Sequence, residues 1–245
     1  MSGFFHTTLY APIYNLLVFL VGVVPGGDIG VAVILATLVV KVLLFPLSLS
    51  AARTQKAMKF IEPELKELRE KYKDDKENQA KEMFALYKKY NIKPFSSFLS
   101  VFIQIPIIIG LYWVFRTEAL PQIDATVLYS FIHAPLTASP LFLSLISVTA
   151  HSYVLAGIAG ITQLIQAWYA IPVPPASAEV EGSAGADFAR AMTIQARFVL
   201  PVIIGFVAYA SGAIALYFIT SNISALLQEF FVRQTHKDPV AVATT

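Results

Sequence analysis

Long apolar segments, separated by polar ones, are the feature that most limits what this chain can fold into. A helix needs about 20 mostly apolar residues to cross a bilayer. Five segments come close to or meet this length, at residues 29–50, 97–116, 147–170, 193–209 and 213–232. Only 14% of the 245 residues are charged, whereas about 25% are charged in soluble domains. The sequence therefore predicts an all-α integral membrane protein with five transmembrane helices.

A further apolar segment, residues 8–24, is shorter and is followed at once by PGGDIG. Too few residues separate it from residue 29 for a tight antiparallel return. We therefore expect an interfacial amphipathic helix in an extracytoplasmic N-terminal region, residues 1–28, with a sixth span as the alternative. The segment has neither a basic n-region nor a small-residue cleavage site, so no secretory signal peptide is expected.

The distribution of Lys and Arg predicts the orientation of the spans, because loops rich in these residues stay in the cytoplasm. Residues 51–94 contain twelve of the 18 Lys and Arg residues, whereas residues 1–28 and 117–146 contain none. The loop 171–192 and the tail 233–245 fall on the same side as 51–94, and both contain Lys or Arg. We expect a multi-pass protein of the bacterial cell (inner) membrane, with its N-terminus outside and its C-terminus in the cytoplasm.

The segment 51–94 has the pattern of two amphipathic helices rather than that of a solvated linker. Apolar residues recur at helical spacing in two sets, namely Ile61, Leu65, Leu68 and Tyr72, then Ala80, Met83, Phe84, Tyr87 and Tyr90. KDDK at residues 73–76 is expected to form the turn. The pattern predicts a cytoplasmic helical hairpin. Residues 171–187 of the predicted cytoplasmic loop 171–192 are rich in Pro, Ala, Ser and Gly, have no apolar period, and are predicted to be flexible.

Polar side chains recur inside the predicted spans. Lys41 lies past the middle of the first span, and a Lys at a helix centre costs roughly 2.5–3.5 kcal/mol on insertion scales. Snorkelling to the inner interface would explain a lone Lys. Other polar residues accompany it, mostly towards the predicted cytoplasmic ends of the spans: Thr37, Gln104, Gln163, Gln166, Tyr217, Ser221 and Asn222.

Lipid cannot satisfy such groups, so they should face each other or water. Hydrogen bonds between helices, each worth about 0.6 kcal/mol, would explain the hydroxyls and amides. They do not require a cation, and no Asp or Glu lies deep in any predicted span. An unpaired Lys41 among polar side chains indicates a hydrated cavity open to the cytoplasm, with an acidic guest.

Other kinds of chemistry have little support in the sequence. There is no cysteine, and the four histidines have no metal-ligand spacing, so no metal or other cofactor is expected. A small transporter or channel should show inverted repeats or broken helices, and neither is apparent. His151 and Ser152 are adjacent but lack the G-x-S-x-G elbow of a hydrolase, which disfavours an intramembrane protease. An assembly scaffold without insertion activity remains an alternative.

Several motifs resemble those of the YidC/Oxa/Alb membrane protein insertases. They are IGVAVILATLVVKVLLFPLSLS, FIEPELKELREKYKDD, MFALYKKYNIKPF with FIQIPIIIGLYWVF, and ALYFITSNISALLQEFF. They occur in the order and spacing of the family, over residues 8 to 232 or so. The resemblance implies five core helices around a polar groove that opens to the cytoplasm and to lipid. It also implies an interfacial helix before the first core span and a mobile cytoplasmic hairpin.

The resemblance further implies which residues act. Lys41 stands where the family usually has a groove arginine, so the charge is kept but the planar fork of donors is lost. Thr37 matches the family's threonine one turn earlier, and Tyr217 and Phe218 match two aromatic residues that line the substrate path. Contacts of the hairpin with clients or the ribosome are expected through basic residues, namely Lys66, Arg69, Lys71 and Lys73.

The implied function is that of an insertase and chaperone, not that of an enzyme. Short hydrophilic segments of newly made membrane proteins would cross through the charged groove, and their helices would leave sideways into lipid. The expected partners are these clients, the lipid bilayer, the Sec translocon and the ribosome, and no direct nucleic-acid function is expected. A large domain before the first span and a long basic tail are not seen, which resembles compact bacterial members.

Overall fold

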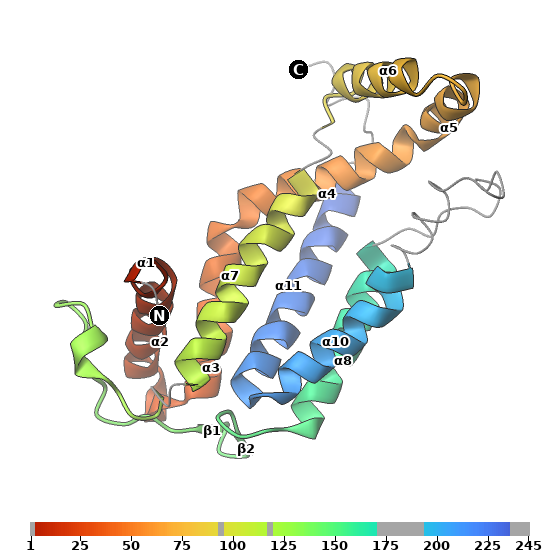
Figure 1. The fold of residues 1–245 in the computed structure, drawn as a ribbon. Coiled ribbons are helices and arrows are strands. Elements are labelled where there is room, and N and C mark those ends of the chain that lie inside the picture. Colours follow the sequence, from red (N-terminus) through yellow and green to blue (C-terminus); the bar gives the residue numbers. More distant parts are fainter. Residues whose placement is uncertain (1–2, 93–95, 117–119, 171–193, 236–245) are drawn as a thin grey trace.

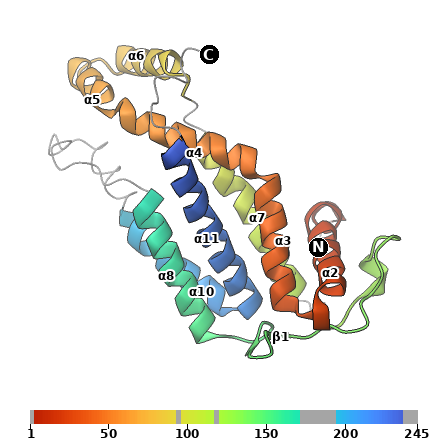
Figure 2. The ribbon, with the colours of Figure 1, turned by 180° about the vertical axis from the view of Figure 1, so that it is seen from behind.

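The computed structural model of the chain describes residues 3–92, 96–116, 120–170 and 194–235. These residues are mostly helical and include one short two-stranded sheet (Figures 1 and 2). The prediction of a helical protein with membrane-capable helices is confirmed, whereas the number of spans stays a prediction. The predicted loop 171–192 and nearly all of the predicted tail lie outside the described residues.

The N-terminal apolar segment consists of α1 (Gly3–Phe5), the π-helical turn η1 (His6–Tyr10) and α2 (Ala11–Val23). It packs against α3 (Ile29–Leu43) and α7 (Ser96–Arg116). The stretch His6–Val23 is long and apolar enough to cross a membrane, as is Gly212–Val232. The interfacial position of residues 8–24 therefore stays a prediction, and the sixth span stays its alternative.

The predicted first span, residues 29–50, is divided into two helices. α3 ends at Leu43, and α4 (Phe45–Phe60) leaves at an angle to it and passes over the ends of α7 and of α11 (Gly212–Thr235) (Figures 1 and 2). Pro46 lies in the first turn of α4. A proline has no N–H and its ring clashes with the carbonyl four residues earlier, which explains the elbow at Leu44.

α4 leads into α5 (Glu62–Lys71) and α6 (Lys76–Lys89), which lie side by side in opposite directions (Figure 1). Their shared core is small and consists of Ile61, Leu65, Leu86 and Ile92. Asp75 caps α6 by accepting a hydrogen bond from the Asn78 N–H over 3.1 Å. The ion pair between Lys89 and Glu64, at 3.3 Å, joins the far end of α6 to the start of α5.

The apolar stripe predicted for the second hairpin helix lies on two faces of α6. Met83, Tyr87 and Tyr90 pack against the hairpin core. Phe84 is instead 62% exposed, and Ala80 is also exposed. Leu86, which the predicted stripe omitted, is the buried residue of α6. Apolar spacing at three and four residues therefore located the helix but not the side that faces α5.

The remaining helices surround α11. α8 (Tyr153–Ala170) packs against α11 and against α10 (Leu200–Tyr209), which continues from the π-helical turn η5 (Gln195–Val199). α8 begins at Tyr153 rather than at residue 147 as predicted. Residues just before it form a hairpin of β1 (Leu141–Phe142) and β2 (Ile146–Ser147), with Leu141 opposite Ser147.

Residues 137–150, which we call the strap, bind the start of α3. The N–H of Ser139 donates to the Gly27 carbonyl (2.8 Å), and the Ser139 carbonyl accepts from the Ile29 N–H (3.1 Å). Asp28 caps α3, because one carboxylate oxygen accepts from the Val31 N–H at 3.0 Å. The other oxygen accepts from the Leu143 N–H at 2.7 Å. The strap therefore holds the start of α3 by both backbone and side-chain hydrogen bonds.

The strap also binds the start of α11. The Val148 carbonyl accepts from the Ser211 hydroxyl at 2.7 Å and from the Ala213 N–H at 2.8 Å. The Ala150 carbonyl accepts from the Gly212 N–H at 3.0 Å. Helix starts leave their first N–H groups without partners inside the helix, so the strap satisfies groups that α11 cannot. It thereby joins the starts of α3 and α11.

The chain between α7 and the strap is held against α2. It contains the short 3-10 helix η3 (Ala125–Val127). The Asn15 amide donates to the Val127 carbonyl over 2.9 Å and accepts from the Tyr129 N–H over 2.7 Å. The Tyr14 hydroxyl accepts from the Asp124 N–H over 2.8 Å. These contacts fix irregular backbone along the side of an apolar helix.

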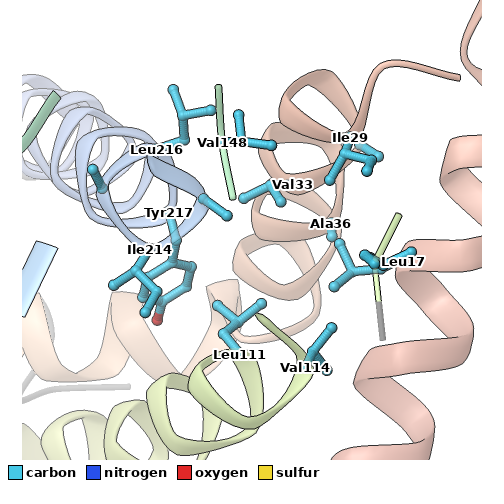
Figure 3. Close-up of a cluster of buried hydrophobic side chains, with 14 of the residues drawn as sticks. Leu17, Ile29, Val33, Ala36, Leu111, Val114, Val148, Ile214, Leu216 and Tyr217 are labelled. Carbon is cyan, nitrogen blue, oxygen red and sulfur yellow. The ribbon is translucent and has the colours of Figure 1, made fainter. Parts of the chain in front are cut away.

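The main apolar core lies where α2, α3, α7 and α11 meet beside the strap (Figure 3). Its side chains belong to different helices and interdigitate. Those labelled in Figure 3 are Leu17, Ile29, Val33, Ala36, Leu111, Val114, Val148, Ile214, Leu216 and Tyr217.

Candidate functional site

Lys41 lies in the last turn of α3, one turn before the elbow. It is half-buried and lies on the same side of α3 as Thr37, four residues earlier. Within the described parts of the chain, Lys41 forms no ion pair and no side-chain hydrogen bond. A helix C-terminus favours a cation by about 0.3–1 kcal/mol, which is less than the cost of placing an ammonium among apolar groups.

Thr37 is buried, and its hydroxyl donates to the Val33 carbonyl of its own helix over 2.7 Å. Its hydrogen-bonding need is therefore met inside α3. The position matches the prediction of a threonine one turn before the charge. A direct role in binding a guest stays a prediction.

Gln104 and Tyr217 join α7 to α11. The Gln104 amide donates a hydrogen bond to the Tyr217 hydroxyl, and Figure 3 shows the Tyr217 side chain pointing from α11 towards α7. Tyr217 is only 3% exposed. The Phe218 ring lies next to it, with centroids 5.5 Å apart, and Ser221 is buried one turn further along α11.

Asn222 joins the other side of α11 to α8. Its amide donates to the Thr162 hydroxyl over 3.2 Å and, more weakly, to the Ala159 carbonyl over 3.5 Å. Within α8, the Gln163 amide donates to the Gln166 side-chain oxygen over 3.2 Å. These amides are satisfied by helix–helix and intrahelical partners.

The predicted site residues therefore form two groups. Gln104 and Tyr217 lie between α7 and α11, whereas Asn222 lies between α11 and α8. Among the hydrogen bonds of the described residues, none joins either group to Lys41. Hydrogen bonding between helices, the alternative raised from sequence, accounts for Gln104, Tyr217 and Asn222. Hydrogen bonds within one helix account for Thr37, Gln163 and Gln166. Neither accounts for the ammonium, which has three donors and no acceptor and so suits a carboxylate or a phosphate.

The four basic hairpin residues are spread along one helix and its turn. Lys66 pairs with Glu62 at 3.3 Å, and the Lys71 ammonium lies 5.2 Å from the centre of the Tyr72 ring. Arg69 and Lys73 are exposed. All four are accessible, and their contact with clients or the ribosome stays a prediction.

Glu64 is held by two partners from α6 and its end. The Tyr90 hydroxyl donates a hydrogen bond to one of its oxygens, and Lys89 pairs with the other. The hydrogen bond from Tyr90, followed by the interaction with Lys89, lowers the pKa of Glu64 below its ordinary value. The contact joins the start of α5 to the end of α6 and so closes the hairpin.

Two structurally important polar residues were missed by the sequence analysis. Asn15 is 1% exposed and holds η3 on α2, and Asp28 both caps α3 and binds the strap. Signals for both exist in the sequence, because an amide inside an apolar segment needs a partner and an Asp just before an apolar helix is a typical N-cap.

A shallow apolar depression of about 760 Å³ lies between α8 and α10. Gly157, Gly160 and Gly205 contribute to its floor, and none of the predicted site residues lines it. In the described part of the chain, no group of three or more His, Asp or Glu side chains could hold a metal ion.

The fold defines a class, namely helical membrane proteins with buried polar side chains between apolar helices and a helical hairpin beyond them. The chain belongs to the YidC/Oxa/Alb family, because the family model described as 60Kd inner membrane protein matches residues 20–239. Proteins named "Membrane protein insertase YidC" from Francisella philomiragia and Francisella tularensis subsp. novicida are each 31% identical to it over 217 residues. The match covers 86% of this chain and 34% of each relative. The chain thus spans about a third of the length of the relatives it matches. Their name is that of an insertase, not of an enzyme.

Proposed function

We propose that this chain is a membrane protein insertase and chaperone, acting alone or with the Sec translocon. It moves short hydrophilic segments of client proteins across the membrane past Lys41 and releases their helices into lipid. One observation carries the proposal, namely a half-buried cation in an apolar helix without an acidic partner among the described residues. The family match over residues 20–239 supports the class of activity.

The charge of Lys41 supplies attraction for an acidic client segment. Two opposite charges 4 Å apart interact by about 4 kcal/mol at an effective dielectric constant of 20, against about 1 kcal/mol in water. This attraction offsets part of the cost of bringing a carboxylate out of water. The client's apolar helix supplies the rest, since burying apolar surface in lipid stabilises it by about 25 cal/mol per Å².

The proposed orientation has the N-terminus outside, five spans, and the α5–α6 hairpin in the cytoplasm with its basic residues available to clients or the ribosome. α2 is proposed to lie at the outer interface rather than to span. The contacts of Asn15 and Tyr14 support this position, because they hold irregular backbone against α2. Lipid-exposed irregular backbone is not tolerated in the hydrocarbon region.

The test is reconstitution of the purified protein in liposomes with a single-span client that has an acidic N-terminal tail. Protease protection of the tail measures insertion for the wild type, Lys41→Ala and Lys41→Arg. We expect insertion to fall with Ala and to be kept with Arg. Lys88→Ala, on the exposed hairpin surface, is the control for removal of a positive charge elsewhere.

A second client with an uncharged tail separates attraction from general damage. Its insertion should be little changed by Lys41→Ala. Equal loss for both clients would show that the variant is misfolded, and normal insertion of the acidic tail would refute the role of the charge. Wild-type insertion no greater than that of empty liposomes would support the scaffold alternative.

A further inference from the structure

The chain from η3 to the first residue of α8, residues 125–153, contains no Asp, Glu, Lys or Arg. It includes the strap, which lies at the end of the molecule where α3, α8 and α11 begin (Figures 1 and 2), whereas its first residues lie along the side of α2. Large apolar side chains in it are nevertheless not covered by the protein. Those more than half exposed are Phe131, Leu136, Leu143, Leu145 and Tyr153.

The β1–β2 turn sorts its apolar residues onto two sides. Phe142 and Ile146 pack against the main core, and Phe142 fits so closely over Gly30 that a Cβ there would lie 2.6 Å from its ring. Leu143 and Leu145 do not belong to this core and are 60% and 80% exposed. One side of the turn is thus anchored in the protein, and the other side presents leucines.

Two residues of this turn, Leu143 and Ser144, have unusual backbone conformations. Their φ angles are 50° and 61°, a left-handed conformation that is unusual for a bulky residue such as leucine. Turns in water generally place Gly or Asn at such positions. The bond from the Leu143 N–H to Asp28 fixes the conformation. A leucine held in this way is difficult to explain if its side chain faces only water.

We propose that the β1–β2 turn is a lipid-contacting surface, which inserts Leu143 and Leu145 into the interfacial region of the leaflet at which α3 and α11 begin. The absence of charged residues between 125 and 153 favours lipid, because no charged side chain of this segment has to lose its water, and the neighbouring Asp28 carboxylate is bound by two backbone N–H groups. The strap is hydrogen bonded to the starts of two apolar helices, so the turn cannot move far from the bilayer.

The aromatic residues at the start of α8 indicate the same depth. Tyr153 is 79% exposed, and its hydroxyl accepts a hydrogen bond of 3.1 Å from the Tyr209 hydroxyl at the end of α10. Tyrosine is enriched where membrane meets water, because its ring is apolar and its hydroxyl polar. The inference requires only a membrane-embedded chain and does not depend on client transfer.

The test uses the natural absence of cysteine from the chain. Leu145→Cys is labelled with an environment-sensitive fluorophore in proteoliposomes of neutral phospholipid. Quenching is then measured with nitroxides attached to lipid chains and, separately, with aqueous iodide. Val202→Cys, 73% exposed on α10, is the lipid-facing control, and Ala85→Cys, exposed on α6, is the water-facing control.

We expect the label at position 145 to be quenched by the lipid nitroxides several-fold more strongly than the label at position 85, and to emit at shorter wavelength. Quenching by iodide to the same extent as at position 85 would overturn the proposal. The proposal would also be overturned if the label at position 145 were protected from iodide in native membranes but not in proteoliposomes. A protein partner, rather than lipid, would then cover the turn. Client insertion is measured independently in the same vesicles. Failure of the proposed insertase function can therefore be distinguished from failure of the proposed lipid contact.

Discussion

Two adjacent glycines before α3 offer a matched test of the strap. Gly26 and Gly27 have φ of 74° and 66°, so alanine at either position would have to adopt a left-handed conformation, at a cost of about 1–2 kcal/mol. Their surroundings differ. A Cβ added to Gly26 has nothing within 4 Å, whereas a Cβ on Gly27 would lie 2.1 Å from the Thr137 carbonyl oxygen.

The extra cost at Gly27 follows from the movement that alanine would force. Carbon and oxygen atoms are normally separated by about 3.3–3.6 Å even in close C–H···O contacts, so the strap must move by roughly 1 Å. This movement disturbs the two backbone hydrogen bonds of Ser139, at 2.8 and 3.1 Å, each worth about 0.5–1.5 kcal/mol. We expect Gly27→Ala to lower the free energy of unfolding by about 2–5 kcal/mol.

The assay is denaturant unfolding of the wild type, Gly26→Ala and Gly27→Ala in the same detergent micelles. Gly26→Ala should lose only the conformational part, about 1–2 kcal/mol. A second readout is proteolysis within the strap, which Gly27→Ala should accelerate and Gly26→Ala should not. Equal destabilisation by the two substitutions would refute the reasoning, because it would show that the contact with Thr137 does not constrain the strap.

Two further predictions concern single hydrogen bonds. Tyr217→Phe should lower the free energy of unfolding by about 0.6–1.7 kcal/mol, and a double-mutant cycle with Gln104→Leu should recover that coupling; additive effects would show that the bond contributes nothing. The lowered pKa of Glu64 means that its contribution to hairpin stability is present above the unfolded pKa of about 4.3 and is lost as pH falls through the folded pKa. The protection of α5 and α6 amides against hydrogen exchange, taken relative to the intrinsic exchange rate at each pH, should therefore fall on acidification in the wild type, and Glu64→Gln should remove that step; matching pH profiles would contradict the role of the contact with Tyr90.

The positions of most helices could be predicted from the sequence, because apolar length alone locates them. The second and fifth predicted spans agree with α7 and α11 within a few residues. The elbow at Leu44 was missed although Pro46 signals it, since the apolar run continues across it. The β1–β2 hairpin was missed for a related reason. Its residues LFLSLI are as apolar as a span, and strands of two residues leave no alternating pattern to detect.

The candidate site was less predictable than the helices. A polar stripe indicates which face of a helix needs a partner, but not which helix supplies it. Gln104 and Tyr217 are 113 positions apart, and their pairing depends on how α7 and α11 pack. The same holds for Asn222 and Thr162 on the other side of α11. Lys41 differs, because a cation in an apolar helix without a counter-charge among the described residues indicates an acidic guest, whichever helices surround it.

Because the strap is hydrogen bonded to the start of α11, a tilt of this helix would pivot at that end. The helix has 24 residues and therefore extends about 36 Å from the end held by the strap. A tilt of about 10° around that end would displace the opposite end by roughly 6 Å, which exceeds the 4.7–4.9 Å between neighbouring strands. A small rotation would therefore open a gap as wide as an extended polypeptide beside the far end of α11, while the hydrogen bonds to Val148 and Ala150 keep its start in place.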